Sequence, residues 1–535
     1  MRPLLNAWLL RTLCALALWC SATAHALTPA DALALVAGDT GDRIETLNRL
    51  STAPEAQAAA LIKAMAEERV RLDGERVLLI EGDSAVDAVT GEALSTVPET
   101  AEDILINNRL RSALETALAG MDLFGAAPER QREAASSLQR NAFEEPDTSQ
   151  LPLLDKALAT DLDPQARDML ELAQAAILLA SDDPAQRLAA AEKLGDARQA
   201  VVRPLLLQRL QTEDSPSVKA ALKASLSALE RTLAINSALA QAFSGISLGS
   251  ILLLAALGLA ITYGLMGVIN MAHGELIMIG AYATWLVQTF FRTQLPEWFD
   301  WYLLAAMPLA FITSALVGAA MERSVIRFLY GRPLETLLAT WGISLVLMQG
   351  VRTLFGAQNV GVENPGWMSG SITLMGSLTL PWNRILIIAF AAAVLLGVTL
   401  MITRTRLGLF VRGVTQNRPI AACMGVNTAR IDTYAFALGS GIAGLAGCAL
   451  SQIGNVGPDL GQNYIVDSFM VVVLGGVGQL AGTVYAALGL GLLNKFLEGW
   501  AGAVLAKIAV LVFIIIFIQK RPQGIFAMKG RSAEA

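Results

Sequence analysis

Histidine and cysteine are scarce in this sequence, and their scarcity excludes several kinds of chemistry. The 535 residues include 2 histidines and 4 cysteines. His25 falls in a segment that we expect to be cleaved, which leaves His273 alone and argues against histidine-based zinc sites and most histidine-dependent nucleophilic catalysis. Residues 27–422 contain no cysteine, so disulfide bonds cannot stabilise that part of the chain.

Motifs for nucleotide hydrolysis and for metal-dependent peptide hydrolysis are also missing. The sequence has no GxxxxGKS/T phosphate loop, no glycine followed directly by lysine, and no HExxH metalloprotease motif. We therefore predict that the chain is not an enzyme, that it has no catalytic or metal-ligating residues, and that it binds no cofactor. Any energy source must belong to another subunit.

Apolar residues are abundant and unevenly distributed. Hydrophobic residues make up 54% of the chain and charged residues 16%, which is typical of a membrane protein. Residues 27–231 hold 35 acidic and 21 basic side chains, whereas residues 232–535 hold 11 and 17. An acidic soluble part is therefore joined to a mildly basic part that meets membrane lipid, and nothing indicates nucleic-acid binding.

The first 26 residues have the layout of a secretory signal peptide. Arg2 and Arg11 precede an apolar run over 12–20, and Ala24-His25-Ala26 follows as a cleavage site. The run is short for a membrane span, although an uncleaved anchor is the alternative. Either way, residue 27 begins outside the cytoplasm.

Residues 27–235 have mainly helical periodicity, which predicts a helical exported domain. Helix starts are marked by a polar residue before proline, as at Asp163-Pro164 and Asp183-Pro184. Two similar stretches end at Leu138 and Leu194 and resemble stacked helical hairpins of the HEAT kind; unrelated helices with similar caps are the alternative. A small β-hairpin is expected near 76–94.

Residues 236–535 predict an all-α polytopic transmembrane domain with about nine spans. The arginine-rich loops and the basic C-terminus should lie in the cytoplasm by the positive-inside tendency. With residue 27 outside and the C-terminus inside, the number of crossings must be odd, and nine satisfies this. The nine predicted spans are 245–266, 275–291, 302–321, 335–354, 385–403, 432–451, 464–477, 481–497 and 502–519.

Two places interrupt the apolar helices and are candidates for a passage through the membrane. In the first, Asn270, His273 and Glu275 form a polar island, and ionisable groups within membranes are costly and often functional. The alternative is a short cytoplasmic turn between two spans. The second place is a glycine-interrupted segment, and its candidate residues are Asp467, Gly475, Gly476 and Gly478. Its alternative is that the glycines only allow close helix packing.

The polar loop over 404–430 carries five arginines and no acidic residue, so we expect a cytoplasmic docking surface there. Within the loop, Asn417 can cap a short helix that has Arg418 and Pro419 in its first turn. Gly425 after Met424 suits a left-handed stop. An ordinary cytoplasmic loop with topology-setting arginines is the alternative.

Several long motifs resemble the permease subunits of branched-chain amino acid ABC transporters. The motifs are INMAHGELIMIGAY, RLGLFVRGVTQNRPIAACMGVN, FALGSGIAGLAG and VVVLGGVGQLAGT. More specifically, the segment 451–478, the IQKRPQGIFAMKGR stretch and the long exported extension resemble the urea-type permease of that family. Gln479, Leu480 and Ala481 depart from the Asn-Leu-Trp sequence that is more frequent in that type.

The resemblance implies an importer built from several subunits in the bacterial inner membrane. Its expected partners are a second homologous permease subunit, two cytoplasmic ATPase subunits that hydrolyse ATP, and a periplasmic urea-binding protein. The resemblance also implies that the region from Arg412 to about residue 427 contacts an ATPase. The predicted function is urea import by alternating access; import of branched-chain amino acids or short amides, a passive urea channel, and a receptor with an exported sensing domain are the alternatives.

Overall fold

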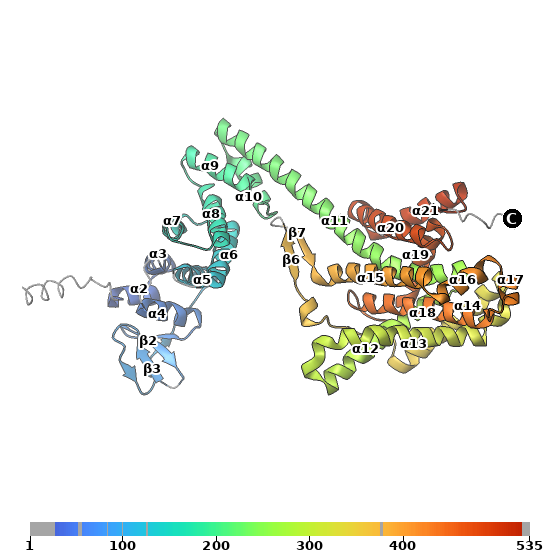
Figure 1. Ribbon diagram of the computed structural model, residues 1–535. Coiled ribbons are helices and arrows are strands. Elements are labelled where there is room, and N and C mark those ends of the chain that lie inside the picture. The colour runs from blue at the N-terminus through green and yellow to red at the C-terminus, as the bar shows by residue number, and fades with distance from the viewer. Residues whose placement is uncertain are drawn as a thin grey trace, which may run out of the picture. The chain divides into compact units, whose positions relative to one another are not determined.

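The computed structural model describes residues 27–526 except 52–55, 83, 99, 125–126 and 375–377. Helices dominate, and the contacts divide the chain into two compact units, Met1–Leu233 and Ala234–Ala535 (Figure 1). The predicted signal peptide, residues 1–26, lies outside the described residues. We call the two parts the N-terminal unit and the membrane unit.

The N-terminal unit opens with three helices and a small antiparallel sheet. Strand β2 pairs with β3 in the register Leu79↔Val86, which forms a hairpin over the range where the sequence predicts one. The sheet has five strands in the order β4-β3-β2-β1-β5, so it extends beyond that hairpin. The elements are α2 (Pro29–Ala37), α3 (Thr40–Ser51), α4 (Ala56–Ala66), β1 (Val70–Asp73), β2 (Arg76–Glu81), β3 (Ser84–Asp87), β4 (Ala93–Leu94) and β5 (Glu102–Asp103).

Helical hairpins fill the rest of this unit. Asp163 and Asp183 cap α8 and α9 by accepting hydrogen bonds from backbone amides of the first turn, as the Asp-Pro pattern predicts. Leu138 and Leu194, the leucines of the two similar stretches, are both fully buried. The helices are α5 (Asn108–Leu123), α6 (Pro128–Glu144), α7 (Leu151–Leu158), α8 (Pro164–Leu178), α9 (Pro184–Gly195) and α10 (Val202–Thr212).

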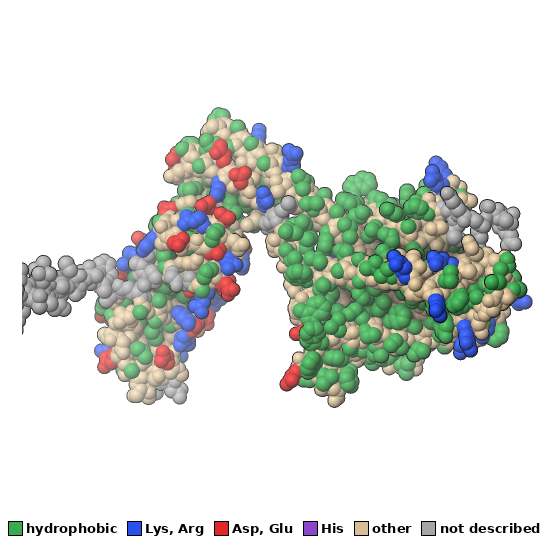
Figure 2. Space-filling view, in the orientation of Figure 1, with side chains coloured by type: hydrophobic (Ala, Val, Ile, Leu, Met, Phe, Trp, Pro, Cys, Tyr) green, Lys and Arg blue, Asp and Glu red, His purple; other side chains and the backbone are tan. Residues whose placement is uncertain are grey.

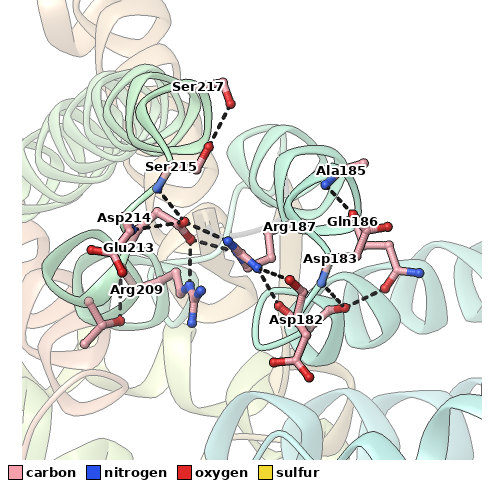
Figure 3. A network of polar contacts seen from close by, with 12 residues as sticks. Asp182, Asp183, Ala185, Gln186, Arg187, Arg209, Glu213, Asp214, Ser215 and Ser217 are labelled. Carbon is pink, nitrogen blue, oxygen red and sulfur yellow. Dashed lines mark hydrogen bonds and ion pairs between the residues drawn. The ribbon is translucent and has the colours of Figure 1, made fainter.

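A buried ion pair joins α9 to the turn that follows α10 (Figure 3). Arg187 donates to both carboxylate oxygens of Glu213, from Nε at 2.8 Å and from Nη2 at 2.9 Å. Its Nη1 donates to the carbonyl oxygens of Ser181 and Asp182 at 2.9 and 2.8 Å. The guanidinium therefore connects three segments of backbone, and such bidentate, charge-assisted bonds are the strong ones.

The Glu213 carboxylate also organises the start of α11 (Pro216–Met266). It accepts from the backbone amide of Ser215 at 3.0 Å and from Arg209 Nε at 3.0 Å. The hydrogen bond from Arg187, helped by these donors, outweighs burial and lowers the pKa of the Glu213 carboxyl to about 2. Glu213 therefore stays ionised and paired at neutral pH.

The membrane unit is a bundle of helices whose outward side chains are mostly apolar (Figure 2). Each of the nine predicted spans coincides with a helix. Seven of the described helices are long and apolar enough to cross a membrane; α12 falls outside that group, and α19 has 16 residues. The count of nine crossings therefore stays a prediction.

The helices after α11 are α12 (His273–Gln294), α13 (Tyr302–Ser324), α14 (Pro333–Phe355), α15 (Trp382–Arg404), α16 (Arg406–Gln416), α17 (Arg418–Cys423), α18 (Thr428–Ser451), α19 (Leu460–Gly475), α20 (Leu480–Ala501) and α21 (Ala503–Lys520). Between α14 and α15, β6 (Ser371–Leu374) pairs with β7 (Leu378–Pro381).

Helix α18 packs against α12 and α13 in the interior of this unit. A Cβ added to Gly444 would lie 2.4 Å from the Ala310 carbonyl oxygen of α13, and one added to Gly447 would lie 1.9 Å from the Ile277 carbonyl oxygen of α12. Larger residues at these positions would force the helices apart. Glycine therefore sets the spacing of the three central helices.

Beyond residue 26, the aromatic residues with the strongest ultraviolet absorbance are confined to this unit. Every tyrosine lies at or beyond Tyr263, and every tryptophan beyond residue 26 lies at or beyond Trp285. Trp298, Trp301 and Trp500 are exposed on its surface, a position typical of tryptophan at membrane interfaces.

The Arg187–Glu213 pair predicts an acid-sensitive N-terminal unit. Because the folded pKa of Glu213 lies below the ordinary value of 4.5, the stabilisation is fully present above about pH 4.5 and is lost as the pH falls toward about 2. Hydrogen exchange of peptides covering 181–217 in the purified full chain should lose protection over that interval.

Glu213→Gln should reduce this protection at neutral pH by at least about tenfold, because it leaves the buried Arg187 charge without its partner. Glu230→Gln is the matched control, since the Arg203–Glu230 pair is half exposed on both sides and such pairs contribute little. Equal protection in the two variants would contradict the prediction.

Candidate functional site

A short non-helical segment, 267–272, separates α11 from α12, as the polar island predicts. It begins at Gly267, whose φ is +67°. Asn270 lies in it with 2% of its surface exposed, and its side-chain oxygen accepts from the Ala272 amide at 3.1 Å. Asn270 Nδ2 has no hydrogen-bond partner among the described residues. Val268, Asn270 and Ala272 of the interruption are buried within protein, whereas Gly267 at its start is exposed; irregular backbone at membrane depth is tolerated where it is buried in protein.

His273 anchors the first residue of α12 to α11. Its Nε2 lies 2.9 Å from the Ala255 carbonyl oxygen, and because a carbonyl oxygen only accepts, Nε2 carries the proton. A Cβ on Gly258 would come within 3.0 Å of the ring, so glycine leaves the space that the imidazole occupies. His273 therefore has a clear structural role in holding the polar segment in place.

Glu275 is buried beside α14, and only one of its two carboxylate oxygens has a hydrogen-bond partner among the described residues. It has 1% of its surface exposed, and Ser344 Oγ donates to its Oε1 at 2.6 Å. Its Oε2 has no partner among the described residues. One turn before Ser344 on α14, Thr340 Oγ1 accepts from the Met271 amide at 3.1 Å. The side chains of α14 thus face the segment that begins α12, and they leave one carboxylate oxygen available as an acceptor.

Backbone contact fixes the helix on the other side of Glu275. A Cβ on Gly274 would lie 2.6 Å from the Gly461 carbonyl oxygen, and one on Gly461 would lie 2.0 Å from that of Gly274. Helices α12 and α19 therefore touch through backbone atoms at the residue before Glu275. No side chain can enter between them there.

The predicted glycine interruption is a turn after α19. Gly476 and Gly478 have φ values of +99° and +78°, which favour glycine. A Cβ on Gly475 would lie 2.5 Å from the carbonyl carbon of Gly482 in α20, and one on Gly264 would lie 2.5 Å from Gly478 Cα. These contacts favour the close-packing alternative for the glycines, and their role in a passage stays a prediction.

Asp467 lies apart from the first polar group. It is half-buried on α19, and its carboxyl interacts electrostatically with Lys507 on α21. In the described part of the chain, no hydrogen bond or ion pair links Asp467 to Asn270, His273 or Glu275. The structure therefore gathers those three residues with α14 and leaves Asp467 outside the group.

The arginine-rich region forms two short helices, α16 and α17, whose ends follow the predicted caps. Asn417 Oδ1 accepts from the backbone amide three residues on at 3.1 Å, Pro419 lies in the first turn of α17, and Gly425 has φ of +84°. Arg412 is exposed on α16, and Met424 after α17 is 79% exposed. Figure 2 shows Lys and Arg side chains at this end of the unit.

Arg418 is held within the chain by a polar network. Its guanidinium pairs with the buried Asp432 of α18 and lies 5.0 Å from the ring centroid of Tyr330. The Tyr330 hydroxyl donates to Glu322 Oε1 at 3.1 Å, and Thr433 donates to Glu322 Oε2 at 2.6 Å. Burial, with the nearby carboxylates of Asp432 and Glu322, raises the pKa of Tyr330, so its hydroxyl keeps the proton that it donates. The network ties α17 to α13 and α18.

A family described as "Branched-chain amino acid transport system / permease component" matches residues 241–519, just over half of the chain. The chain belongs to this family. The family-level resemblance predicted from the motifs is thereby confirmed, and the membrane unit is that of a permease. Residues before 241 lie outside this match.

Curated relatives of this permease include transport proteins for different substrates. The high-affinity branched-chain amino acid transport system permease protein LivH of Salmonella typhimurium is 29% identical over 297 residues, which cover 54% of this chain and 94% of LivH. BraD of Pseudomonas aeruginosa, of the same description, is 28% identical over 291 residues, 54% of this chain and 95% of BraD. The ribose import permease protein RbsC of Escherichia coli is 30% identical over 209 residues, 36% of this chain and 61% of RbsC. No solved structure matches the permease.

The permease contains one GxSxG sequence, at 245–249, which is also the spacing of a hydrolase nucleophile elbow. In the structure, Ser247 is buried in the middle of α11. Gly245 and Gly249 leave room for α20, since a Cβ on either would lie within 3 Å of its backbone. A nucleophile elbow needs a strand-to-helix turn, so this motif serves helix packing.

Sequence reasoning missed the partners on α14 and the network around Arg418. Ser344 and Thr340 are small hydroxyl residues in an apolar helix, which gives no local signal. Glu322 and Asp432 could have been found, because each is a carboxylate at the end of an apolar run, where a buried charge needs a partner.

Gly461→Ala should destabilise the permease, because the added methyl would overlap the Gly274 carbonyl oxygen. Overpacking of this kind costs about 1–3 kcal/mol, which lowers the thermal midpoint by several degrees in a domain of this size. Tryptophan fluorescence of the detergent-purified chain measures the transition. Gly489→Ala in α20 is the control, because no atom of the described residues outside its own stretch of helix lies within 4 Å of its added Cβ. Equal midpoints would show that α12 and α19 are not in backbone contact.

Proposed function

We propose that this permease is the membrane subunit of an ATP-binding-cassette importer for urea. The observation that carries the proposal is the Glu275 carboxylate, buried beside α14 with one oxygen bonded to Ser344 and the other unused. Urea is small, neutral and planar, with four N–H donors and one carbonyl acceptor. An unused carboxylate oxygen matches its donors, and Asn270 Nδ2, which also lacks a partner, matches its carbonyl oxygen.

The absence of a cation supports a neutral substrate over a zwitterion. None of the ion pairs among the described residues involves Glu275, and no arginine or lysine there hydrogen-bonds to it. An amino acid needs a positive group or a helix N-terminus for its carboxylate as well as an acceptor for its ammonium, and of the positive groups only the helix N-terminus of α12 is present beside Glu275. The Glu275 group offers acceptors to N–H donors without an arginine or lysine beside them.

Branched-chain amino acids are the second candidate substrate. The observation in favour is the description of LivH and BraD, which align with more than nine-tenths of their own length. In binding-protein-dependent importers, much of the selectivity belongs to the binding protein. Uptake measurements therefore distinguish urea from branched-chain amino acids as the substrate.

The proposed orientation follows from charge. The N-terminal unit lies in the periplasm after removal of residues 1–26, and the arginines of 404–430 and the C-terminal Lys520 and Arg521 lie in the cytoplasm. A second homologous permease subunit completes the membrane part in the bacterial inner membrane. A periplasmic urea-binding protein delivers the substrate.

The proposed ATPase contact combines charge with exposed apolar side chains. Leu409, Ile420 and Met424 on and beside α16 and α17 are 60%, 61% and 79% exposed, and Arg412 lies exposed on the same segment. Apolar side chains flanked by charge are typical of a protein interface. Two partner ATPase subunits hydrolyse ATP, and alternating access follows from their movement of this surface.

Uptake of labelled urea, with labelled leucine in parallel, tests the proposal. A strain lacking this chain should lose urea uptake, and the intact chain should restore it. Arg412→Glu should abolish the restored uptake at normal protein level, whereas Arg140→Glu, at an exposed arginine of the N-terminal unit, should leave it unchanged. Loss of leucine uptake with unchanged urea uptake in the deletion strain would overturn the substrate assignment.

Glu275→Gln tests the passage. Losing a hydrogen bond to a charged group typically costs about 1.5–3 kcal/mol, so urea uptake should fall by roughly tenfold or more. The control is Glu297→Gln, at an exposed glutamate in the short helix before α13. Equal uptake in the two variants at equal abundance would show that charge at position 275 is irrelevant to transport.

A further inference from the structure

The contact between α12 and α14 extends beyond Glu275. Tyr282 follows Glu275 by seven residues on α12, and Phe355 follows Ser344 by eleven on α14, which returns each to the same helical face. Glu275 contacts Ser344, and Tyr282 contacts Phe355. The two contacts are therefore successive levels of one seam between the helices, separated by about 10 Å along α12.

Aromatic rings close the seam at the Tyr282 level. The Tyr282 and Phe355 rings stack with their centroids 4.9 Å apart and their planes at 27°. Trp285 meets both rings edge-on, at 6.5 and 5.9 Å. The buried residues of this separate apolar cluster are Met278, Ala281, Tyr282, Val351 and Val456.

The Tyr282 hydroxyl lies within this cluster without a partner. Tyr282 has 2% of its surface exposed, and its hydroxyl oxygen makes no hydrogen bond to any described residue. Buried tyrosine hydroxyls usually have a partner, since leaving one unpaired costs free energy. A hydroxyl both donates and accepts, so this one suits a polar molecule that passes along the seam.

An ion pair and a pair of backbone hydrogen bonds lie near the Tyr282–Phe355 contact. Arg352 of α14 pairs with Asp459, which precedes α19, at 2.6 Å. Val360 and Val456 exchange two backbone hydrogen bonds of 2.8 Å. The Asp459 carboxylate interacts electrostatically with both Tyr282 and Glu275, which places all three in one region. Residues of α12, α14 and the segment before α19 therefore surround the Tyr282 end of the seam.

We propose that Tyr282 is a second substrate-binding residue, whose hydroxyl holds a small uncharged amide one step before or after Glu275 while Phe355 covers it. The inference rests on the proposed function and adds a residue and a ligand class to the same passage. The hydroxyl donates to the amide carbonyl oxygen, and Glu275 Oε2 accepts from an amide N–H. Because the two levels are about 10 Å apart along α12 and about 16 Å apart along α14, one small molecule occupies them in turn.

Tyr282→Phe in the complete transporter removes the hydroxyl and keeps the stacked ring. The maximal rate of urea uptake should fall about two- to tenfold, the effect of one neutral hydrogen bond, at normal abundance and with ATPase activity still stimulated by the binding protein. Tyr485→Phe is the matched control, because Tyr485 is also stacked, on Phe526 at 5.8 Å, yet is exposed. Equal rates in the two variants would overturn the inference.

Thiourea separates binding from a purely structural effect, because sulfur accepts hydrogen bonds less well than oxygen. The intact transporter should prefer urea to thiourea, and Tyr282→Phe should lose part of that preference while Tyr485→Phe keeps it. An unchanged preference in Tyr282→Phe would assign the tyrosine to packing alone. If the intact chain fails to restore urea uptake, the proposed function fails, and the amide assignment fails with it; if uptake is restored and only the Tyr282 result is negative, this inference alone is wrong.

Discussion

Close backbone contact at glycine determines the geometry of the membrane unit. Lipid chains are as apolar as leucine, so membrane helices gain little from burying apolar side chains against each other and depend on dense packing. Gly444 and Gly447 bring α18 against α13 and α12, and Gly461 brings α19 against Gly274. Helix α12 is thus held on two sides at distances that admit no side chain. Its polar first turn consequently faces protein, and burial of a carboxylate there becomes possible.

Two buried carboxylates in this unit show how differently such a group can be accommodated. Glu322 accepts hydrogen bonds from Tyr330 and Thr433 and lies beside Arg327, so both of its oxygens are satisfied. Glu275 has the Ser344 hydroxyl on one oxygen and no protein partner in the described residues on the other. A fully satisfied carboxylate holds helices together, whereas a half-satisfied one keeps the capacity to bind. The contrast separates the structural network near α17 from the candidate passage.

Local signals predicted much of the secondary structure and of the site. The caps at Asp163 and Asn417 depend on a few consecutive residues, and so does the interruption before α12, which is why sequence patterns identify them. The pairing of Glu275 with Ser344 joins residues 69 positions apart, and no local pattern encodes that register. Arg418 shows the same limit: the loop arginines indicated a docking surface, but its partner Asp432 faces it only once α18 has packed. Strands β1, β5, β6 and β7 were missed; each has two to four residues, too few for an alternating pattern to stand out.

The distribution of aromatic residues gives the two units different optical properties. Since no tyrosine lies before residue 263 and no tryptophan lies between residues 27 and 284, the near-ultraviolet absorbance of tyrosine and tryptophan and the tryptophan fluorescence of residues 27–535 arise in the membrane unit alone. Residues 27–233 of the N-terminal unit contribute to neither signal. A tryptophan introduced into its helical hairpins would therefore report that unit without background from its own residues, and Trp285, edge-on to the Tyr282 and Phe355 rings, already stands where a change in the seam would alter its emission.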